Sequence, residues 1–399
     1  MTARLPTLLR SALVVGVILA ACRSSSHSSS GSRADAGAAA GRDSAAGEVA
    51  ARDPKNIYAA AGANALSPEA ARAVSLVYVP NSRSATVSVI DPKTHRVARQ
   101  FKTGAVPQHV VPTYDLSRLW VLNNEASTIT PIDPRTGHEG APMHVDDPYN
   151  MYFTPDGKEA IVVAERRQRL DFRDPRTMEL IESEHVPCRG LDHMEFTADG
   201  RFVIATCEFS GHLVKVDLTT HRAVGSLELD SAGLVLKAMP QDIRSAPDGH
   251  AFYVADMMAD GVHVIDPVAF RRVGFIKTGK GAHGIFPSRD GRFLYVTNRG
   301  WNTTAGRPHG AGSISVLDPR QERIVSTWTI PGGGSPDMGG VTADGKELWL
   351  SGRYDSEVYV FDTATGALTH RIPVGREPHG LCVWPQPGRY SLGHTGNMR

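Results

Sequence analysis

The chain has 399 residues, of which 43 are basic and 42 acidic, so its formal net charge is +1. This balance creates no overall field that would attract a polyanion, and no basic run with interleaved aromatic residues occurs, so we expect no nucleic-acid partner. The four cysteines are too few for disulfides to be what holds the fold together.

The first 22 residues have the features of a bacterial export signal. Two arginines precede a stretch, residues 12–21, that is almost wholly apolar. About ten apolar residues cannot cross a bilayer, which takes roughly twenty in a helix, so the stretch is typical of a cleaved signal. Its Leu-Ala-Ala-Cys ending resembles the bacterial lipoprotein signal, in which cleavage precedes the cysteine and that cysteine, here Cys22, is acylated. The alternative is an ordinary secretory signal with a chance cysteine.

Residues 23–52 consist mainly of Ser, Gly and Ala with scattered charges. Such a segment has too few large apolar groups to offset the entropy of ordering, which predicts a flexible tether. Globular structure is then expected over residues 53–399. We expect a monomer anchored by lipid in the bacterial cell envelope, facing the periplasm or the exterior. Arg23, rather than an aspartate, follows the cysteine, which favours the outer membrane where two membranes exist.

From residue 77 onward one pattern occurs seven times: an apolar strand, a variable stretch, a strand ending in Asp, another strand, and a strand of small residues. Successive units are 42, 41, 43, 49, 42 and 54 residues apart. Periods near forty residues with four strands each indicate propeller blades. The units begin at Val77, Leu119, Ala160, Val203, Phe252, Leu294 and Leu348. The sequence therefore predicts an all-β fold, a seven-bladed β-propeller with four-stranded antiparallel blades.

The repeats start with the second strand of a blade and finish with an innermost strand. This order predicts that the propeller closes by pairing its N- and C-terminal strands, with residues 379–385 completing the first blade. Ser67, Pro68 and Glu69 are typical of a helix start, so a short helix to about Val74 is expected beside that seam.

The sixth unit opens with the strand Leu294-Tyr295-Val296-Thr297-Asn298, which is the second strand of its blade. It resembles the repeat of the YVTN-repeat (YncE-like) β-propeller family. Two weaker copies begin at Tyr78 and Tyr253, and the resemblance covers about residues 75–388. It implies the propeller fold, but that fold carries many functions, including lactonases and redox enzymes.

Turn residues indicate which end of the propeller carries binding chemistry. Asp-Gly pairs between first and second strands supply the positive φ that tight hairpins need, and the repeated Asp after each third strand fits a turn that bonds backbone amides. Both turn sets emerge on one face. The opposite face carries the connections that vary between blades, so we expect the functional site there.

At that second face, the innermost strands begin with polar pairs around the axis. The pairs are Gln108-His109, Tyr149-Asn150, Asp192-His193, Gln241-Asp242, His283-Gly284, Asp337-Met338 and His379-Gly380. Converging neutral imidazoles are good ligands for Zn, Cu or Ni, so His109, His193, His283 and His379 are candidate metal ligands. Because successive strand residues point to opposite sides, the four histidines need not face the same way. The alternative is a polar channel mouth closed by hydrogen bonds.

The loops between second and third strands add further candidates to this face. They are Glu165, Glu208, Asp256, Asn298, Arg299 and Arg353, next to Asp192, Asp242 and Asp337 of the innermost strands. Carboxylates and amides in such a cluster could hold Ca²⁺ or share acid and base roles. They could equally form ion pairs with the arginines, which is the commoner arrangement.

Two cysteines, Cys188 and Cys207, fall at the same end of one blade. They could form a disulfide, or Cys207 could bind a metal with His193. The third, Cys382, is expected to be a small buried residue. No Cys-x-x-Cys-His occurs, so covalent c-type haem is not expected.

The longest connection, residues 300–312, contains four glycines together with Trp301, Arg307 and His309. This composition suits a lid that folds over a ligand. The alternative is a disordered surface insertion, which could have the same composition.

Motifs for a nucleophile elbow, a phosphate loop and a zincin site do not occur. We therefore expect a binding or scaffolding module that takes a small molecule or an envelope protein on its polar face. The rival hypothesis is an enzyme that uses the axial histidines and carboxylates, either a metal-dependent oxidoreductase or a lactonase-like hydrolase.

Overall fold

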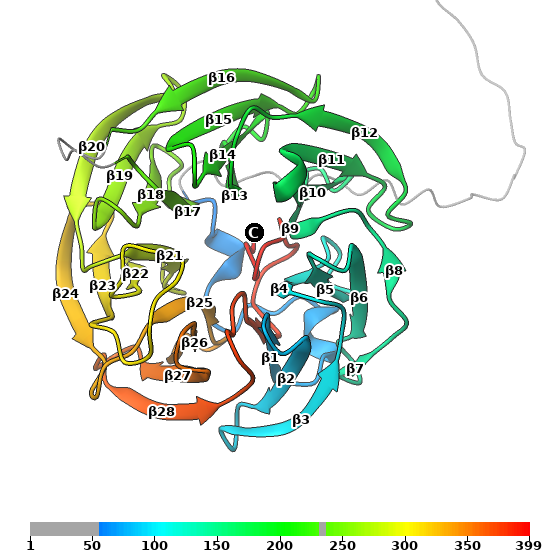
Figure 1. Ribbon diagram of the computed structural model, residues 1–399, viewed down its shortest axis with the longest axis vertical. Helices are drawn as coiled ribbons and strands as arrows, with labels where there is room; N and C mark the ends of the chain where they lie inside the picture. Colours follow the sequence, from blue (N-terminus) through cyan, green and yellow to red (C-terminus); the bar gives the residue numbers. More distant parts are fainter. Residues whose placement is uncertain (1–55, 231–236) are drawn as a thin grey trace, which may run out of the picture. The chain divides into compact units, whose positions relative to one another are not determined.

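The predicted repeats form separate antiparallel sheets that stand around a common axis (Figure 1). The computed structural model describes residues 56–230 and 237–399, and within these the sheets number seven. The seven-bladed propeller predicted from the repeat period is thus confirmed. The signal peptide, Cys22 and the tether over residues 23–52 lie outside the described residues.

The first blade is built from both ends of the described chain. Its strands, from the axis outward, are β29 (Cys382–Trp384), β1 (Leu76–Asn81), β2 (Thr86–Asp91) and β3 (Arg96–Lys102). In the register of β29 against β1, Leu76 pairs with Trp384 and Tyr78 pairs with Cys382. Closure through the N- and C-terminal strands is therefore confirmed.

The other blades follow the chain. Blade two has β4 (Pro107–Pro112), β5 (Leu119–Asn123), β6 (Thr128–Asp133), and an outer edge split into β7 (His138–Glu139) and β8 (Met143–His144). Blade three has β9 (Pro148–Phe153), β10 (Ala160–Ala164), β11 (Arg169–Arg173) and β12 (Leu180–His185). Blade four has β13 (Leu191–Phe196), β14 (Phe202–Cys207), β15 (His212–Asp217) and β16 (Arg222–Glu228).

Blade five has β17 (Pro240–Ser245), β18 (Phe252–Asp256), β19 (Gly261–Asp266) and β20 (Arg271–Lys277). Blade six has β21 (Ala282–Pro287), β22 (Leu294–Asn298), β23 (Ser313–Asp318) and β24 (Arg323–Thr329). Blade seven has β25 (Pro336–Val341), β26 (Glu347–Gly352), β27 (Glu357–Asp362) and β28 (Leu368–Pro373).

Helical structure is confined to three short 3-10 turns in the described part of the chain: η1 (Ala59–Ala61), η2 (Ala70–Arg72) and η3 (Glu165–Arg167). The second lies where a short helix was expected, and the Ser67 hydroxyl accepts a hydrogen bond from the Ala70 amide. No helix within these residues is long and apolar enough to span a membrane.

The apolar core lies between neighbouring blades. One cluster joins Tyr152 and Ile161 of blade three to Met194 and Val203 of blade four, all of them buried. Each blade thus buries its faces only against its neighbours, which is why the sheets require a closed ring.

Both predicted sets of turns are present. Gly157, Gly200 and Gly345 have positive φ in the hairpins between first and second strands. The repeated Asp after the third strand accepts backbone amide hydrogen bonds, as Asp91 does from Lys93. These aspartates belong to the scaffold, and the chemistry of interest lies at the other face.

Candidate functional site

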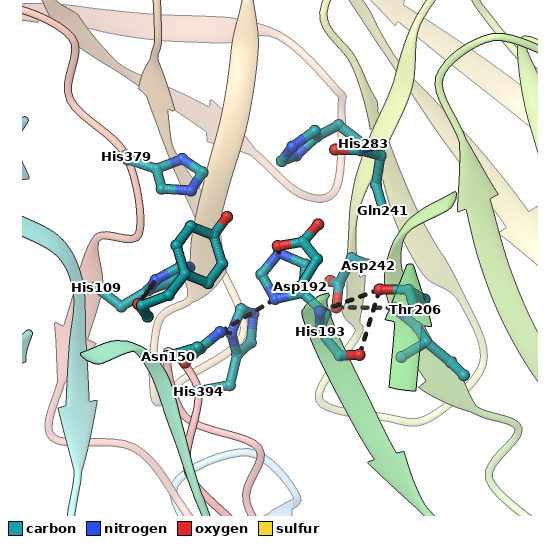
Figure 2. Close-up of polar contacts among 12 residues, drawn as sticks. His109, Asn150, Asp192, His193, Thr206, Gln241, Asp242, His283, His379 and His394 are labelled. Atoms are coloured by element: carbon teal, nitrogen blue, oxygen red, sulfur yellow. Dashed lines mark hydrogen bonds and ion pairs between the residues drawn. The ribbon is translucent and has the colours of Figure 1, made fainter. Parts of the chain in front are cut away.

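The innermost strands place two successive residues toward the axis. A β-bulge makes this arrangement, because the pairing of the first and second strands skips a residue or more at this point in six blades. A bulge re-aims side chains that strict alternation would send to opposite faces. In Figure 2, His283 and His379 form an outer layer, and His109, Asn150 and His193 lie deeper.

The outer layer opens into a polar cavity of about 170 Å³ at the channel mouth. Its walls come from the starts of innermost strands and from the loops between second and third strands. The lining residues are Gln108, Tyr149, Glu165, Glu208, Phe209, Gln241, His283, Arg299, Thr304, Arg353 and His379.

One carboxylate, Asp337, organises the basic side of this cavity. Its Oδ1 accepts a hydrogen bond from Nε of Arg299 at 2.8 Å and lies 2.9 Å from Nδ1 of His283. Its Oδ2 lies 2.7 Å from Nδ1 of His379. Burial alone would raise the pKa of Asp337, but Arg299 and the two imidazoles outweigh burial and hold that pKa well below its usual range. Asp337 is therefore an anion that orients three neighbours.

Arg353 completes the basic side, and its guanidinium is not fully engaged. Nη1 is 3.9 Å from Oδ2 of Asp337, too far for a hydrogen bond. Nε and Nη1 have no hydrogen-bond partner among the described residues, although only 16% of the side chain is exposed. A buried cationic fork with free donors in a cavity wall is suited to an anionic ligand group.

The opposite wall carries two glutamates, Glu165 and Glu208. Burial, reinforced by the Glu208 and Asp147 carboxylates, raises the pKa of Glu165 to about 7. Burial also raises the pKa of Glu208, although a hydrogen bond from Gln241 and the charges of the arginines act in the other direction. The Glu165 carboxyl can therefore hold a proton near neutral pH and donate a hydrogen bond.

Beneath the cavity three imidazoles meet: His109, His193 and His394 (Figure 2). One ring nitrogen from each lies within 4.8 Å of the others, and all three residues are buried. Nδ1 of His109 lies 3.0 Å from the Tyr149 carbonyl oxygen. Asn150 Nδ2 lies 3.1 Å from Nδ1 of His193 and 2.9 Å from Nδ1 of His394.

His394 was not among the residues predicted from the sequence. It reaches the axis because the C-terminal segment turns back into the ring, where the His394 amide donates to the Met151 carbonyl and Gly393 bridges Tyr152. Gly393 has φ +96 and no room for a Cβ, which would meet the Met151 oxygen at 2.3 Å. Apart from such glycines, nothing in this segment distinguishes it from a surface tail, so its sequence carried no signal.

The four histidines predicted as one metal set are neighbours around the axis, with the His109 and His379 ring centroids 4.8 Å apart and those of His193 and His283 6.4 Å apart, but only His109 and His193 belong to the three-imidazole group. His109 and His193 lie in the deeper layer with His394, whereas the Nδ1 atoms of His283 and His379 lie beside Asp337 in the outer layer. Gly380, which follows His379, leaves the space that the His109 ring occupies, since a Cβ there would lie 2.2 Å from that ring.

Three other predicted residues face their own blades or neighbouring strands. Asp242 accepts hydrogen bonds from the amides of Ile243 and Ile285, and burial raises its pKa to about 6. Asp256 accepts from the Met239 amide and bonds His263 within blade five. Asn298 donates to Ser313 and Ser315 within blade six. Asp192 lies at the axis beside His193, with its Oδ1 3.2 Å from Nε2.

The loop over residues 300–312 is fastened to its neighbours. Trp301 donates from Nε1 to the Arg307 carbonyl, and Asn302 bonds the Met257 carbonyl and Asp260 of blade five. Thr304 lines the cavity, whereas Trp301 does not. The loop therefore forms part of the cavity wall in this conformation.

Cys188 and Cys207 form a disulfide with a Cα–Cα distance of 5.3 Å. Cys207 is consequently not available as a partner for His193 in metal binding. Cys382 is a free, buried thiol.

Replacing His109 by Gln is expected to flatten the acid-side dependence of stability on pH. Burial lowers the pKa of His109 to about 3, so between pH 6.5 and about 3 the unfolded chain binds a proton that the folded imidazole does not. Wild-type stability then falls as pH falls through this window, and the variant should lose up to about 1.4 kcal/mol per pH unit of that slope. Urea unfolding at several pH values measures it. Gln108→Asn changes a neighbour that does not titrate and should leave the slope unchanged. An unchanged slope in His109→Gln would contradict the lowered pKa of His109.

Comparison with solved structures gives the same fold at low identity. A functionally unknown protein from Desulfotomaculum acetoxidans has a TM-score of 0.62 at 14% identity, over 78% of this chain and 100% of that one. Hydrazine synthase of Kuenenia stuttgartiensis has a TM-score of 0.56 at 17% identity, over 69% and 88%. A dihydro-heme d1 dehydrogenase, NirN, has a TM-score of 0.57 at 14% identity, over 80% and 76%.

These likenesses show the fold alone, because every identity is below 20%. No curated protein matches the sequence. The profile of the YNCE-like beta-propellers, however, matches residues 39–388, which is most of the chain and includes all seven blades. The resemblance carried by the Tyr-Val-Thr-Asn strand is confirmed: the chain belongs to the YNCE-like β-propeller family.

Proposed function

We propose that this protein is a binding module that captures a small hydroxylated organic acid at the mouth of its channel. The observation that carries the proposal is the Arg353 side chain, which lines the cavity and whose Nε and Nη1 have no hydrogen-bond partner among the described residues. A carboxylate is the natural complement of such a fork.

The opposite wall supports the hydroxyl part of this assignment. Because the pKa of Glu165 is raised to about 7, its carboxyl can donate to a ligand hydroxyl or accept from it near neutral pH, and burial shifts the pKa of the neighbouring Glu208 in the same direction. The cavity has a volume of about 170 Å³. That is the scale of a small acid and excludes a polymer from the cavity itself.

Replacing Arg353 by Met is expected to weaken binding of such an acid about 10- to 100-fold. A hydrogen bond to a charged group contributes about 1.5–3 kcal/mol, and the uncharged side chain keeps most of the packing. The ligand is found first, by thermal shift with malate, tartrate, citrate and gluconate in metal-free buffer, and affinities are then measured calorimetrically.

Arg320→Met is the matched control, because Arg320 is exposed in a turn after a third strand and does not line the cavity. It should bind as the wild type does. If the Arg353 variant bound the acid as tightly as the wild type does, the guanidinium would not be part of the binding site, and the proposed acid site would be contradicted. No binding of any acid in the panel would also count against the proposal.

An enzyme remains the second candidate, favoured by one observation: the pKa of Glu165 near 7 suits a general acid or base at neutral pH. Ring opening of a lactone by water yields a hydroxy acid, so a lactonase-like hydrolase would leave its product in the same cavity. Incubating the protein with lactones that match the acids it binds separates the two. Recovery of unchanged lactone favours a binding module, and turnover favours the hydrolase.

We also propose that the module is attached to a membrane of the bacterial cell envelope through acylated Cys22. Support comes from the Leu-Ala-Ala-Cys ending of the export signal. In a bacterial host, wild-type protein should partition into detergent, whereas Cys22→Ser should remain aqueous and fold normally. Wild-type protein found in the aqueous phase would contradict the lipid anchor.

A further inference from the structure

We propose that His109, His193 and His394 form a binding site for one divalent transition metal ion that favours imidazole, Zn²⁺ or Cu²⁺. Ligand binding at the mouth depends on Arg353 and not on these rings, so this proposal and the proposed function can fail separately. The C-terminal segment supplies the third ligand, which gives its burial at the axis a role beyond packing.

The first support is a set of buried nitrogen atoms without partners. Nε2 of His109, of His193 and of His394 has no hydrogen-bond partner among the described residues, and all three residues are fully buried. Buried polar atoms nearly always have a hydrogen-bond partner. Three buried imidazole nitrogens without one in a single cluster therefore require an explanation. An ion between the rings would satisfy all three.

Contacts made by Nδ1 fix the orientation of each of the three rings. The Tyr149 carbonyl accepts from Nδ1–H of His109, which leaves the lone pair on Nε2. Nδ1 of His193 and Nδ1 of His394 both contact the side-chain amide of Asn150. With the amide nitrogen facing them, both Nε2 atoms carry the proton, so ligation through Nε2 requires Asn150 to turn its oxygen toward the rings. Asn150 is thus a positioning residue with a testable effect.

Geometry sets what binding must change. One ring nitrogen of each imidazole, either Nδ1 or Nε2, lies within 4.8 Å of those of the other two, whereas ligands at ~2.0–2.1 Å in tetrahedral coordination lie about 3.3 Å apart. The rings must therefore move inward around the ion. A carboxylate stands near for a fourth position, because Oδ1 of Asp192 has no hydrogen-bond partner among the described residues and lies 3.2 Å from Nε2 of His193.

The experiment titrates Zn²⁺ into the chelator-treated full-length protein, with a competing chelator to report affinity. We expect one equivalent of Zn²⁺ to bind tightly. His394→Gln should weaken Zn²⁺ binding more than about 100-fold, because losing a ligand should cost more than the 10- to 100-fold loss caused by changing a residue that hydrogen-bonds a ligand. His309→Gln is the matched control, because that imidazole is 67% exposed in the long loop. Asn150→Asp should strengthen binding about tenfold or more, since a carboxylate accepts from Nδ1–H of both rings.

Wild-type protein that binds no stoichiometric Zn²⁺ at micromolar free metal would overturn the proposal. So would equal affinity with and without His394. Because a variant can fail to fold, Co²⁺ is added to the wild-type protein as well. The intense d–d absorption of tetrahedral Co²⁺ with nitrogen ligands is expected, and a spectrum of the hydrated ion alone would overturn the site.

Discussion

Removal of residues 379–399 is expected to abolish cooperative unfolding of the propeller. The deletion takes away β29, the innermost strand of blade one, and exposes the edge of β1 along Leu76 to Tyr78. It also removes the buried Trp384 and the bond from the His379 amide to the Pro80 carbonyl. Blades one, two and seven then lose the contacts that close the ring, and no other strand in the described residues can replace them.

A shorter deletion serves as the control. Removing residues 388–399 takes away the C-terminal segment but keeps β29, so the difference between the two truncations isolates the closing strand. Urea unfolding followed by tryptophan fluorescence and by far-ultraviolet circular dichroism should give coincident transitions only for the protein with the shorter deletion. If the protein with the longer deletion unfolds at the same urea midpoint and with the same slope as the protein with the shorter deletion, the closing strand is not needed for cooperative unfolding.

The blades were predictable because each is specified by short-range signals that repeat. Asp-Gly hairpins, strands that end in Asp and a period near forty residues recur with little change, and repetition separates them from chance. The closing strand followed from the order of strands alone. A single copy of the Tyr-Val-Thr-Asn strand would have carried far less.

The site was only partly predictable, since it depends on departures from the repeat. The bulge that brings both Asp192 and His193 toward the axis is not visible in a sequence read with strict alternation. Asp256 and Asn298 occupy equivalent ends of second strands, and both form hydrogen bonds within their own sheets. Their position in the repeat, rather than their ability to bind a ligand, therefore decides which partners they have. His394 has no counterpart in any blade, and Asp337 was recognised as polar but not as the centre of four side chains.

The ion pair between Glu195 and Arg399 is expected to contribute more to stability than any exposed pair in the propeller. Glu195 is fully buried, and its Oε1 accepts from Nη2 of Arg399 at 2.8 Å and from Asn397 at 3.1 Å. Arg399→Met leaves a buried carboxylate without its cation, which costs about 3–5 kcal/mol when a buried pair is broken.

The exposed pair of Arg201 with Asp217 provides the comparison. The arginine is 62% exposed, so Arg201→Met should cost less than about 1 kcal/mol. Adding Glu195→Gln to Arg399→Met should recover part of the loss, because the amide keeps an acceptor for the Phe196 amide but carries no charge. The free energies come from urea unfolding of the wild type and of these three variants. Equal costs for Arg399→Met and Arg201→Met would mean that the C-terminal segment, which carries His394, is held at the axis by packing alone and not by the buried charge pair.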